Sequence, residues 1–221
     1  MEKQLFQRLE ELYPEMVQIR RQLHQFPELS FQEVKTPQMI ADFLENIGVE
    51  VRRNVGGRGV LGYIKGGHPG KTVAIRADFD ALPIQEETNL PFASQHPGVM
   101  HACGHDAHTA TLLVLAKALM EIRAELSGTI VLIHQFAEEL APGGAIEMIK
   151  DGCLQNVDVI FGTHVWSSFP FGTIGYRQGA IMAAADRFEL TIYGKGGHGA
   201  SHMRQLMLLQ WELLSLHNYS N

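Results

Sequence analysis

The chain has 221 residues, 45% of them hydrophobic and 19% charged, which is enough apolar material for a globular protein with one or two domains. Its formal net charge of −6, with no interleaving of basic and aromatic residues, argues against a nucleic-acid partner or an anionic membrane surface. No stretch reaches the roughly 18 apolar residues of a membrane span, and two cysteines in unlike contexts argue against a disulfide scaffold, so a cytoplasmic location is expected.

The N-terminal part of the chain predicts two helices followed by three strands. Residues 3–26 place leucine, isoleucine and methionine at helical spacing, and Pro14 marks the position where this helix could break. Its charged sequence lacks the apolar segment of a signal peptide. Thr36 is expected to cap a second helix that ends near Gly48. Strands separated by glycine-rich turns are then expected at 49–55, 59–66 and 72–80.

The remainder of the chain alternates helices and strands. We expect a helix from Ala107 to about Leu126, a buried strand at 129–139, a short helix at 143–152 and a buried strand at 157–165. This alternation predicts an α/β fold with a mostly parallel sheet covered on both faces. After residue 170, the segments FGTIGYRQG and AADRFELTIYGKG are expected to form strands that lead into a second, more antiparallel unit near 181–186.

Polar side chains collect where the predicted strands end. They are Asp78, Asp80, Glu138, Glu139 and His164, and the loop before the third helix adds Cys103 and His105. In open α/β sheets, binding sites form outside the carboxyl ends of the strands. We therefore expect these segments, which are far apart in the sequence, to share one site.

Cys103 and His105 are candidate ligands of a soft divalent metal ion. A small buried cysteine beside a polar helix start is the plainer explanation of an isolated Cys-x-His sequence. Here Gly104 allows the backbone to bend so that both side chains face one point. Thiolate and imidazole suit zinc, cobalt or nickel. Of the other polar residues nearby, Asp106 is expected to be the N-cap of the following helix, and His101 and His108 are expected to be supporting or surface groups.

The Glu138–Glu139 pair follows a buried strand, where unpaired negative charge is costly. A surface acid pair is the alternative, but a metal would offset the cost. One glutamate would then bind the metal and the other would act as general base toward water. His164 closes another buried strand, which we expect to lie beside the strand of Glu138, whereas His134 in mid-strand is interpreted as structural.

Two further residues have candidate roles around this site. Asp80 could hydrogen-bond a ligand imidazole and fix its tautomer, or simply form a turn before Leu82-Pro83. The segment GKGGHGAS (194–201) lacks the context of a phosphate loop. Its glycines suit a close approach of His198 to a ligand, where the imidazole could donate to a developing oxyanion.

Six segments together resemble the M20 peptidase family, in particular the N-acyl-amino-acid amidohydrolases of the hippurate hydrolase-like and auxin-conjugate hydrolase-like kinds. The matching segments are RRQLHQFPELSFQE (20–33), IRADFDALPIQEE (75–87), MHACGHDAHTATLL (100–113), FAEELAPGGA (136–145), FGTHVW (161–166) and GKGGHGAS (194–201). The resemblance is continuous from the N-terminus to about residue 201. Several of these motifs are long, so their joint occurrence in this order is specific.

This resemblance implies a hydrolase that uses two divalent metal ions, of zinc, manganese, cobalt or nickel, to cleave the amide bond of a small N-acyl amino acid. It implies Cys103, His105, Glu139 and His164 as metal ligands, Glu138 as the general base and Asp80 as the acid that supports the metal centre. Asp78 takes the place of a histidine ligand in other branches. His198 matches a lid histidine that, in family homodimers, reaches into the partner's active site.

The resemblance ends after Ser201, and it sets the expected domains: residues 1–182 as the N-terminal part of a catalytic domain and 183–221 as an incomplete lid. One reading frame away, the codons of Ser-His-Met-Arg-Gln-Leu-Met can encode the Pro-His-Glu-Thr-Ile-Asp segment of the family. We therefore expect residues 202–221 to arise from a frameshift, the second metal site to lack a ligand, and this chain to be inactive or weakly active. A genuine short form is the alternative.

Two other functions compete with the amidohydrolase. A dipeptidase or aminopeptidase of the same superfamily would use the same centre, although the Cys103-Gly104-His105 arrangement favours the amidohydrolase branch. A non-catalytic fragment that binds metal or a partner belongs to another class. A purely structural zinc module is the weakest option, because the candidate ligands stand beside a spare glutamate, as in an open catalytic site.

Overall fold

The structure is a computed structural model that describes residues 2–182, 191 and 193. The chain divides into two compact units, Met1–Ser168 and Phe169–Asn221. In the second unit the described residues form no helix or strand, so FGTIGYRQG is not the strand that the sequence predicts. AADRFELTIYGKG lies mostly outside the described residues, and the expected domain boundary after residue 182 stays a prediction.

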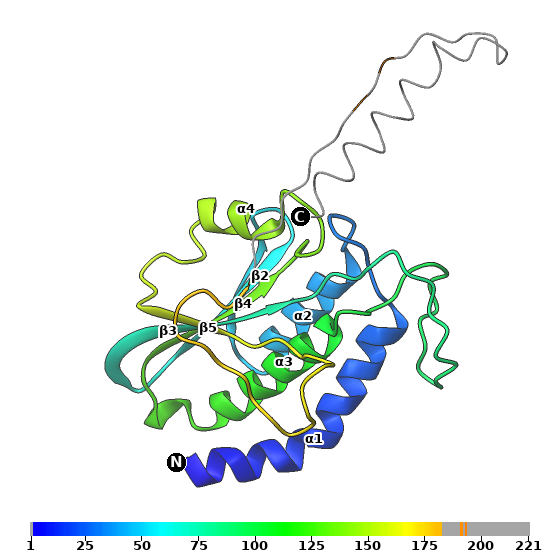
Figure 1. The fold of residues 1–221 in the computed structure, drawn as a ribbon. Helices are drawn as coiled ribbons and strands as arrows, with labels where there is room; N and C mark the ends of the chain where they lie inside the picture. The colour runs from blue at the N-terminus through cyan, green and yellow to red at the C-terminus, as the bar shows by residue number, and fades with distance from the viewer. Residues whose placement is uncertain (1, 183–190, 192, 194–221) are drawn as a thin grey trace, which may run out of the picture. The chain divides into compact units, whose positions relative to one another are not determined.

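The elements of the first unit alternate as the sequence predicts, with small shifts of their ends. They are α1 (Glu2–Gln25), α2 (Lys35–Asn46), β1 (Glu50–Val55), β2 (Gly59–Lys65), β3 (His68–Asp78), α3 (His105–Glu121), the 3-10 turn η1 (Arg123–Glu125), β4 (Ser127–Gln135), α4 (Gly144–Lys150) and β5 (Val159–Gly162). β3 begins before the expected residue 72, and α3 begins at His105 rather than Ala107. Figure 1 shows these elements as a sheet with helices packed against it.

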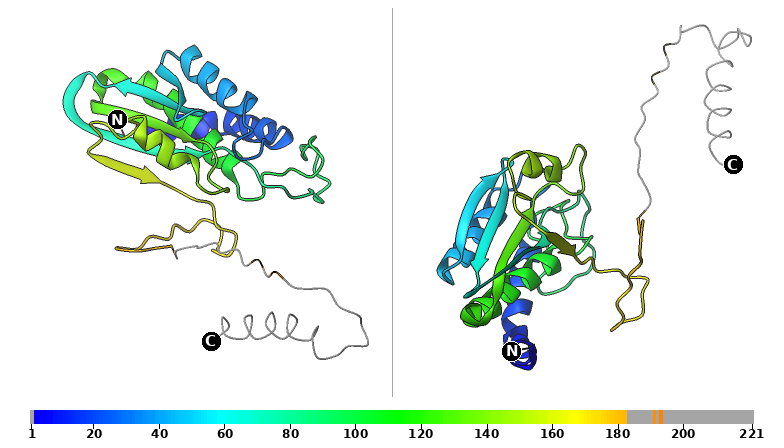
Figure 2. Two further views of the ribbon diagram at one scale, coloured as in Figure 1. Left: turned by 90° about the horizontal axis from the view of Figure 1, so that it is seen from above. Right: turned by 90° about the vertical axis from the view of Figure 1, so that its left-hand side faces the viewer.

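The sheet has the strand order β1-β2-β4-β3-β5. β2 runs antiparallel to β1 and β4, whereas β3 runs parallel to both β4 and β5. The α/β class is therefore confirmed. The sheet in the described residues is mixed, with two parallel pairings around β3 and two antiparallel pairings on the side of β1 and β2. β5 is an edge strand, visible as the yellow-green arrow at the side of the sheet in both views of Figure 2.

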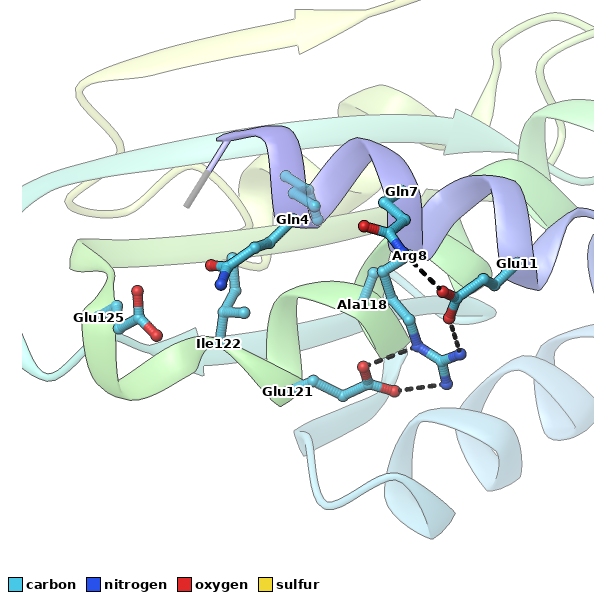
Figure 3. A pocket seen from close by; sticks show the side chains of 9 residues that line it. Gln4, Gln7, Arg8, Glu11, Ala118, Glu121, Ile122 and Glu125 are labelled. Atoms are coloured by element: carbon cyan, nitrogen blue, oxygen red, sulfur yellow. Dashed lines mark hydrogen bonds and ion pairs between the residues drawn. The ribbon is translucent and has the colours of Figure 1, made fainter.

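The helix α1 packs along α3 and continues without a break through Pro14. Leu12 of α1 lies in one apolar cluster with Val114 and Ala118 of α3. Arg8 and Glu121 line a groove of about 340 Å³ between the two helices, and the Arg8 guanidinium donates there to both carboxylate oxygens of Glu121, at 2.8 and 2.9 Å (Figure 3). This groove contains none of the candidate ligands. No helix in the described ranges is both long and apolar enough to cross a membrane.

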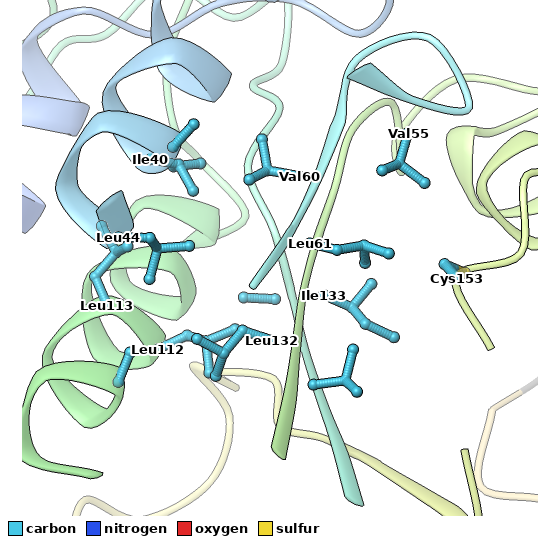
Figure 4. Packing of buried hydrophobic residues seen from close by; sticks show 14 of the residues in the cluster. Ile40, Leu44, Val55, Val60, Leu61, Leu112, Leu113, Leu132, Ile133 and Cys153 are labelled. Carbon is cyan, nitrogen blue, oxygen red and sulfur yellow. The ribbon is translucent and has the colours of Figure 1, made fainter. Parts of the chain in front are cut away.

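Apolar side chains fill both faces of the central strands (Figure 4). On one face, residues of α2 and α3 meet β4, and on the other, β1, β2 and β4 face Cys153. The labelled members are Ile40, Leu44, Val60, Leu112, Leu113 and Leu132 on the first side, and Val55, Leu61, Ile133 and Cys153 on the second. Each such buried side chain contributes roughly 1.5–3 kcal/mol to folding. The expectation of a sheet covered on both faces holds for these strands, whereas the residues of β5 are exposed.

Thr36 is not the cap of the second helix. It lies inside α2, whose N-cap is Val34 and lacks a side-chain cap. The orphan N–H groups of Val34, Lys35 and Thr36 instead donate to the carboxylate of Glu28, at 2.8–3.0 Å. A carboxylate at a helix N-terminus also interacts favourably with the helix dipole. Glu28, seven residues before the helix start at Lys35, thus supplies the cap that the local pattern assigned to Thr36.

Candidate metal centre

Three neighbouring parallel strands end at the same edge of the sheet, because β3 lies between β4 and β5. The segments beyond them carry the expected site residues: Asp80 after β3, Glu138 and Glu139 after β4, and His164 after β5. The loop before α3 adds Cys103, and α3 opens with His105. The expectation that the strand of His164 pairs with the strand of Glu138 is wrong, since β3 separates them.

His105 stands at the centre of this cluster, with a fully buried side chain. Its Nδ1 lies 3.2 Å from Oδ1 of Asp80, a contact that assigns the proton to Nδ1 and leaves a lone pair on Nε2. Nε2 has no hydrogen-bond partner among the residues that the structure describes. It lies 3.6 Å from Oε1 of Glu139 and 3.7 Å from Oδ2 of Asp78. A buried lone pair that faces carboxylate oxygens has the environment of a cation ligand.

Cys103 and His164 approach this cluster from another side. The Sγ atom of Cys103 lies 3.3 Å from Nε2 of His164. Nδ1 of His164 lies 2.6 Å from the carbonyl oxygen of Val165, so Nδ1 donates and Nε2 is left to bind. Burial, followed by the nearby carboxylate of Glu139, raises the pKa of the Cys103 thiol to about 12. In these buried and negatively charged surroundings, the thiolate of Cys103 forms at neutral pH only when a cation offsets its charge.

Glu138 and Glu139 differ in exposure and in their distance from His105. The side chain of Glu139 is 19% exposed, and that of Glu138 is 39% exposed. Oε1 of Glu139 is buried and has no hydrogen-bond partner in the described part of the chain. The corresponding distance from Nε2 of His105 to Glu138 is longer, 4.0 Å. Burial and the charge of Glu139 raise the pKa of Glu138. A solvent-accessible carboxylate of raised pKa suits proton transfer, and the buried one suits ligation.

The donor set fits a divalent cation. Three overlapping groups each bring their donor atoms within 4.8 Å of one another: Cys103–His105–His164, Asp78–His105–His108 and His105–Glu138–Glu139. Buried polar atoms without a hydrogen bond are costly, and here Nε2 of His105 and Oε1 of Glu139 are such atoms within the described residues. Oδ2 of Asp78, in contrast, is paired with Nη1 of Arg76 at 2.7 Å. Thiolate, imidazole and carboxylate together match the ligand preferences of zinc and its neighbours in the first transition row.

His108 supports the cluster through Asp78. Its Nδ1 lies 2.7 Å from Oδ1 of Asp78, and its Nε2 accepts the N–H of Val165 at 3.0 Å. Burial would raise the pKa of Asp78, but the hydrogen bond with His108 and the charges of His105 and Arg76 lower it to about 2. Asp78 is therefore a carboxylate at neutral pH. Because both nitrogens of His108 are engaged, the supporting role expected for this residue agrees with its contacts.

Two other histidines are buried as neutral side chains. His134 is fully enclosed in the core, as its structural interpretation requires, and burial lowers its pKa to about 3. His101 is also buried, so it is not a surface group, and this burial lowers its pKa to about 4. Neither belongs to a candidate metal-binding group in the part of the chain that the structure describes.

Asp106 is not the N-cap of α3, because the cap position is Gly104 and Asp106 is the second helical residue. Its buried carboxylate pairs instead with two residues of α1. Oδ2 lies 2.7 Å from Nδ1 of His24 and 2.7 Å from Nε of Arg20. Nε2 of His24 in turn lies 3.3 Å from Glu86. The start of α3, and with it His105, is thereby fixed to α1 and to the loop that contains Glu86.

This network predicts a pH dependence of stability. The hydrogen bond with Asp106 raises the pKa of His24 above its usual value. A base whose pKa is raised on folding contributes stability fully below its unfolded pKa of about 6.5 and loses it as the pH rises through the folded value. We expect His24→Gln to destabilise the protein more at pH 6 than at pH 9, as measured by urea unfolding. An equal loss at both pH values would contradict this.

Gly104 has the backbone geometry that the sequence predicts for it, with φ of +89°. A Cβ atom there would lie 2.3 Å from Cγ2 of Val165. We expect Gly104→Ala to lower the free energy of unfolding by at least the roughly 1–2 kcal/mol of left-handed strain and to weaken metal binding. Gly152→Ala is the matched control, because Gly152 has φ of +84° with its nearest atom at 3.6 Å. Equal metal affinity of the two variants, measured by calorimetry, would refute the prediction.

The sequence analysis did not identify two residues that contact the site, and one expected residue lies outside the described part of the chain. Ser30 donates to Asp80 at 2.6 Å, and the fully buried Glu33 accepts the N–H of Ala137 at 2.8 Å. Both belong to the segment FPELSFQE, where polar and apolar residues are mixed, so nothing in the residue types singled them out. The expected contribution of His198 falls outside the described residues and stays a prediction.

Comparisons with known proteins agree with this site and fold. The family model of peptidase family M20/M25/M40 matches residues 74–212. The chain is 62% identical over 200 residues to YhaA of Bacillus subtilis (strain 168), covering 90% of this chain and 50% of YhaA. It is 50% identical over 202 residues to the N-acyl-L-amino acid amidohydrolase of Geobacillus stearothermophilus, covering 90% of this chain and 54% of that enzyme. The chain thus spans about half the length of the curated relatives it matches.

A solved structure supports the fold and the involvement of divalent metals. The chain resembles the crystal structure of Bacillus subtilis YXEP, described as a dinuclear metal-binding peptidase of the M20 family. The TM-score is 0.73 at 48% identity, and the match covers 77% of this chain and 48% of that one. The strand order, the cluster around His105 and the family match lead to one conclusion: this chain belongs to peptidase family M20/M25/M40, a family of hydrolases.

Proposed function

We propose that this chain carries the metal-binding and proton-transfer residues of an N-acyl-amino-acid amidohydrolase. The observation that carries the proposal is the surroundings of Nε2 of His105, a buried nitrogen without a hydrogen bond in the described residues, with Glu139 at 3.6 Å and the more exposed Glu138 at 4.0 Å. The pairing of one buried and one accessible carboxylate is what amide hydrolysis at a metal centre needs.

The metal centre would contain two divalent ions of zinc, manganese, cobalt or nickel. Their ligands would be Cys103, His105, Glu139 and His164. Bound divalent ions would supply Lewis acidity toward the carbonyl group of the scissile amide. Asp80 holds the ring of His105 through Nδ1, so that its Nε2 keeps facing the same point. A ligand thiol must stay reduced, which is why we propose a cytoplasmic location.

The proton would be handled by Glu138. Its carboxylate takes a proton from the attacking water and later passes it to the leaving amine, and its raised pKa suits both transfers. His198 would donate to the oxyanion, from the lid of a partner subunit in a homodimer. The substrate would be a small N-acyl amino acid, the class named for the Geobacillus stearothermophilus relative.

A peptidase of the same family is the second candidate, because YXEP is described as a peptidase. Both reactions break an amide bond and use the same metal centre. They differ in the group beside the bond, which is an acyl chain in one substrate class and a free amino terminus in the other. A panel of N-acetyl amino acids and dipeptides separates the two.

A chimaera tests the proposed function, since the chain spans about half of its relatives. Residues 1–201 are joined to the part of the Geobacillus stearothermophilus enzyme that follows its matched stretch, and that enzyme serves as the positive control. We expect the folded chimaera, with added divalent metal, to hydrolyse N-acetyl amino acids. A folded, metal-loaded chimaera that cleaves only dipeptides would favour the peptidase, and one that cleaves neither class would refute both candidates.

A further inference from the structure

The turn that carries Glu138 and Glu139 has an unusual backbone. Ala137, immediately before Glu138, has φ of +46°, in the left-handed region that costs a non-glycine residue roughly 1–2 kcal/mol. Surrounding contacts must therefore hold it. The carbonyl group of Ala137 accepts the N–H of Gly144 at 2.9 Å. Its own N–H donates to Oε1 of Glu33 at 2.8 Å, a residue 104 positions earlier in the sequence.

Glu33 occupies a position that is costly for a carboxylate. Its side chain is fully buried, and Oε2 has no hydrogen bond in the described part of the chain. Its nearest cationic group, Nε of Arg58, lies 3.9 Å from Oε2. Burial raises the pKa of Glu33 to about 7. A buried carboxylate with an oxygen that lacks a hydrogen bond is expensive, so its short hydrogen bond with the N–H of Ala137 stands out.

The segment around Glu33 contacts the same turn at further points. Ser30 donates to Oδ2 of Asp80 at 2.6 Å, and the same oxygen accepts the N–H of Glu139 at 3.0 Å. The ring of Phe31 packs edge-on against Phe136 at 5.9 Å between centroids. The turn therefore has a carboxylate acceptor at each side of Glu138: Glu33 at the preceding residue and Asp80 at the following one.

We propose that Glu33 is a positioning residue that clamps the turn and thereby aims Glu138 and Glu139. The inference rests on the proposed function, since it assigns Glu33 to the same centre. Loss of the acceptor leaves the N–H of Ala137 buried and unpaired, and the backbone relaxes from its left-handed conformation. Glu139 then leaves its place 3.6 Å from His105. Displacements of about 1 Å in such groups can cost on the order of 100-fold in rate.

The test compares three variants of the full chain by titration with Co²⁺, followed by calorimetry and by the visible spectrum of the bound ion. Glu33→Leu removes the acceptor, and Glu33→Gln keeps it. Glu28→Ala is the matched control, because Glu28 caps α2 from the same segment without a contact to the turn. We expect Glu33→Leu to bind Co²⁺ roughly 10–100-fold more weakly, with an altered spectrum. Glu33→Gln and Glu28→Ala should retain the wild-type affinity and spectrum.

Wild-type binding by Glu33→Leu, or an equal loss in Glu28→Ala, would overturn the inference. If Glu33→Leu does not fold, Glu33→Asp, which withdraws the carboxylate by one methylene, is judged by the same criteria. Hydrogen exchange at the Ala137 amide of the metal-free protein separates this inference from the proposed function. A wild-type chain that binds no Co²⁺ would contradict the proposed function. If the Ala137 amide exchanges as slowly in Glu33→Leu as in the wild type, the positioning role of Glu33 is refuted, whatever the metal titration shows.

Discussion

Replacing His105 by asparagine is expected to abolish tight binding of divalent metal. The asparagine amide can retain a hydrogen bond with Asp80, in place of the Nδ1 contact at 3.2 Å, but it has no atom in the position of Nε2. His105 belongs to all three groups of candidate ligands in the described residues. We expect the loss of affinity to exceed the roughly 10–100-fold that is typical when only a partner of a ligand is removed. Isothermal titration with zinc, cobalt and manganese measures it.

His68→Asn is the matched control for this variant, since His68 is exposed at the start of β3 and belongs to no candidate group. The control should bind metal as the wild type does. Thermal unfolding of both variants shows whether the fold is retained. If His105→Asn remains folded and binds metal within threefold of the wild-type affinity, His105 is not a ligand and the centre is assigned incorrectly.

Replacing Glu138 by glutamine in the chimaera is expected to reduce kcat by roughly 100- to 10,000-fold, the usual contribution of a general acid–base residue. The amide has the shape of the carboxylate but cannot take a proton from water. Metal affinity should change little, because Glu138 is the more exposed and more distant of the two glutamates. Steady-state kinetics with an N-acetyl amino acid, together with calorimetry, separate the two effects.

Glu125→Gln serves as the control, because Glu125 is exposed on the 3-10 turn η1 and lies outside the candidate groups. It should leave kcat unchanged. If Glu138→Gln instead lost metal while Glu139→Gln retained it, the roles assigned to the two glutamates would have to be exchanged.

Local sequence patterns predicted where this site forms. The apolar run before Gln135 marked β4 as buried, so the acids that follow it had to lie at a strand end. The glycine between Cys103 and His105 predicted a bent backbone, and Gly104 has φ of +89°. These features depend on a few neighbouring residues, which is why the sequence reveals them.

Long-range pairing was beyond the reach of the same patterns. No local signal determines whether β5 adds beside β3 or beside β4, because this depends on how the chain crosses over the sheet. Capping residues show the same limit. Asp106 has the residue type of an N-cap, but its partner is His24, 82 residues away. The carboxylates of Glu28 and Glu33 accept backbone N–H groups of the α2 start and of Ala137, and motif spacing alone does not predict these pairings.

Titration of the purified chain with Co²⁺, followed by absorption spectroscopy, is the sharpest test of the metal centre. A thiolate bound to cobalt gives a sulfur-to-metal charge-transfer band, and Cys103 lies 3.3 Å from His164 at the proposed site. We predict that this band appears in the wild type and in the control variant Cys153→Ser. Cys153 is buried and belongs to none of the candidate groups in the described residues. The band should be absent from Cys103→Ser. Tight cobalt binding without the band, or a band that persists in Cys103→Ser, would contradict the ligand set.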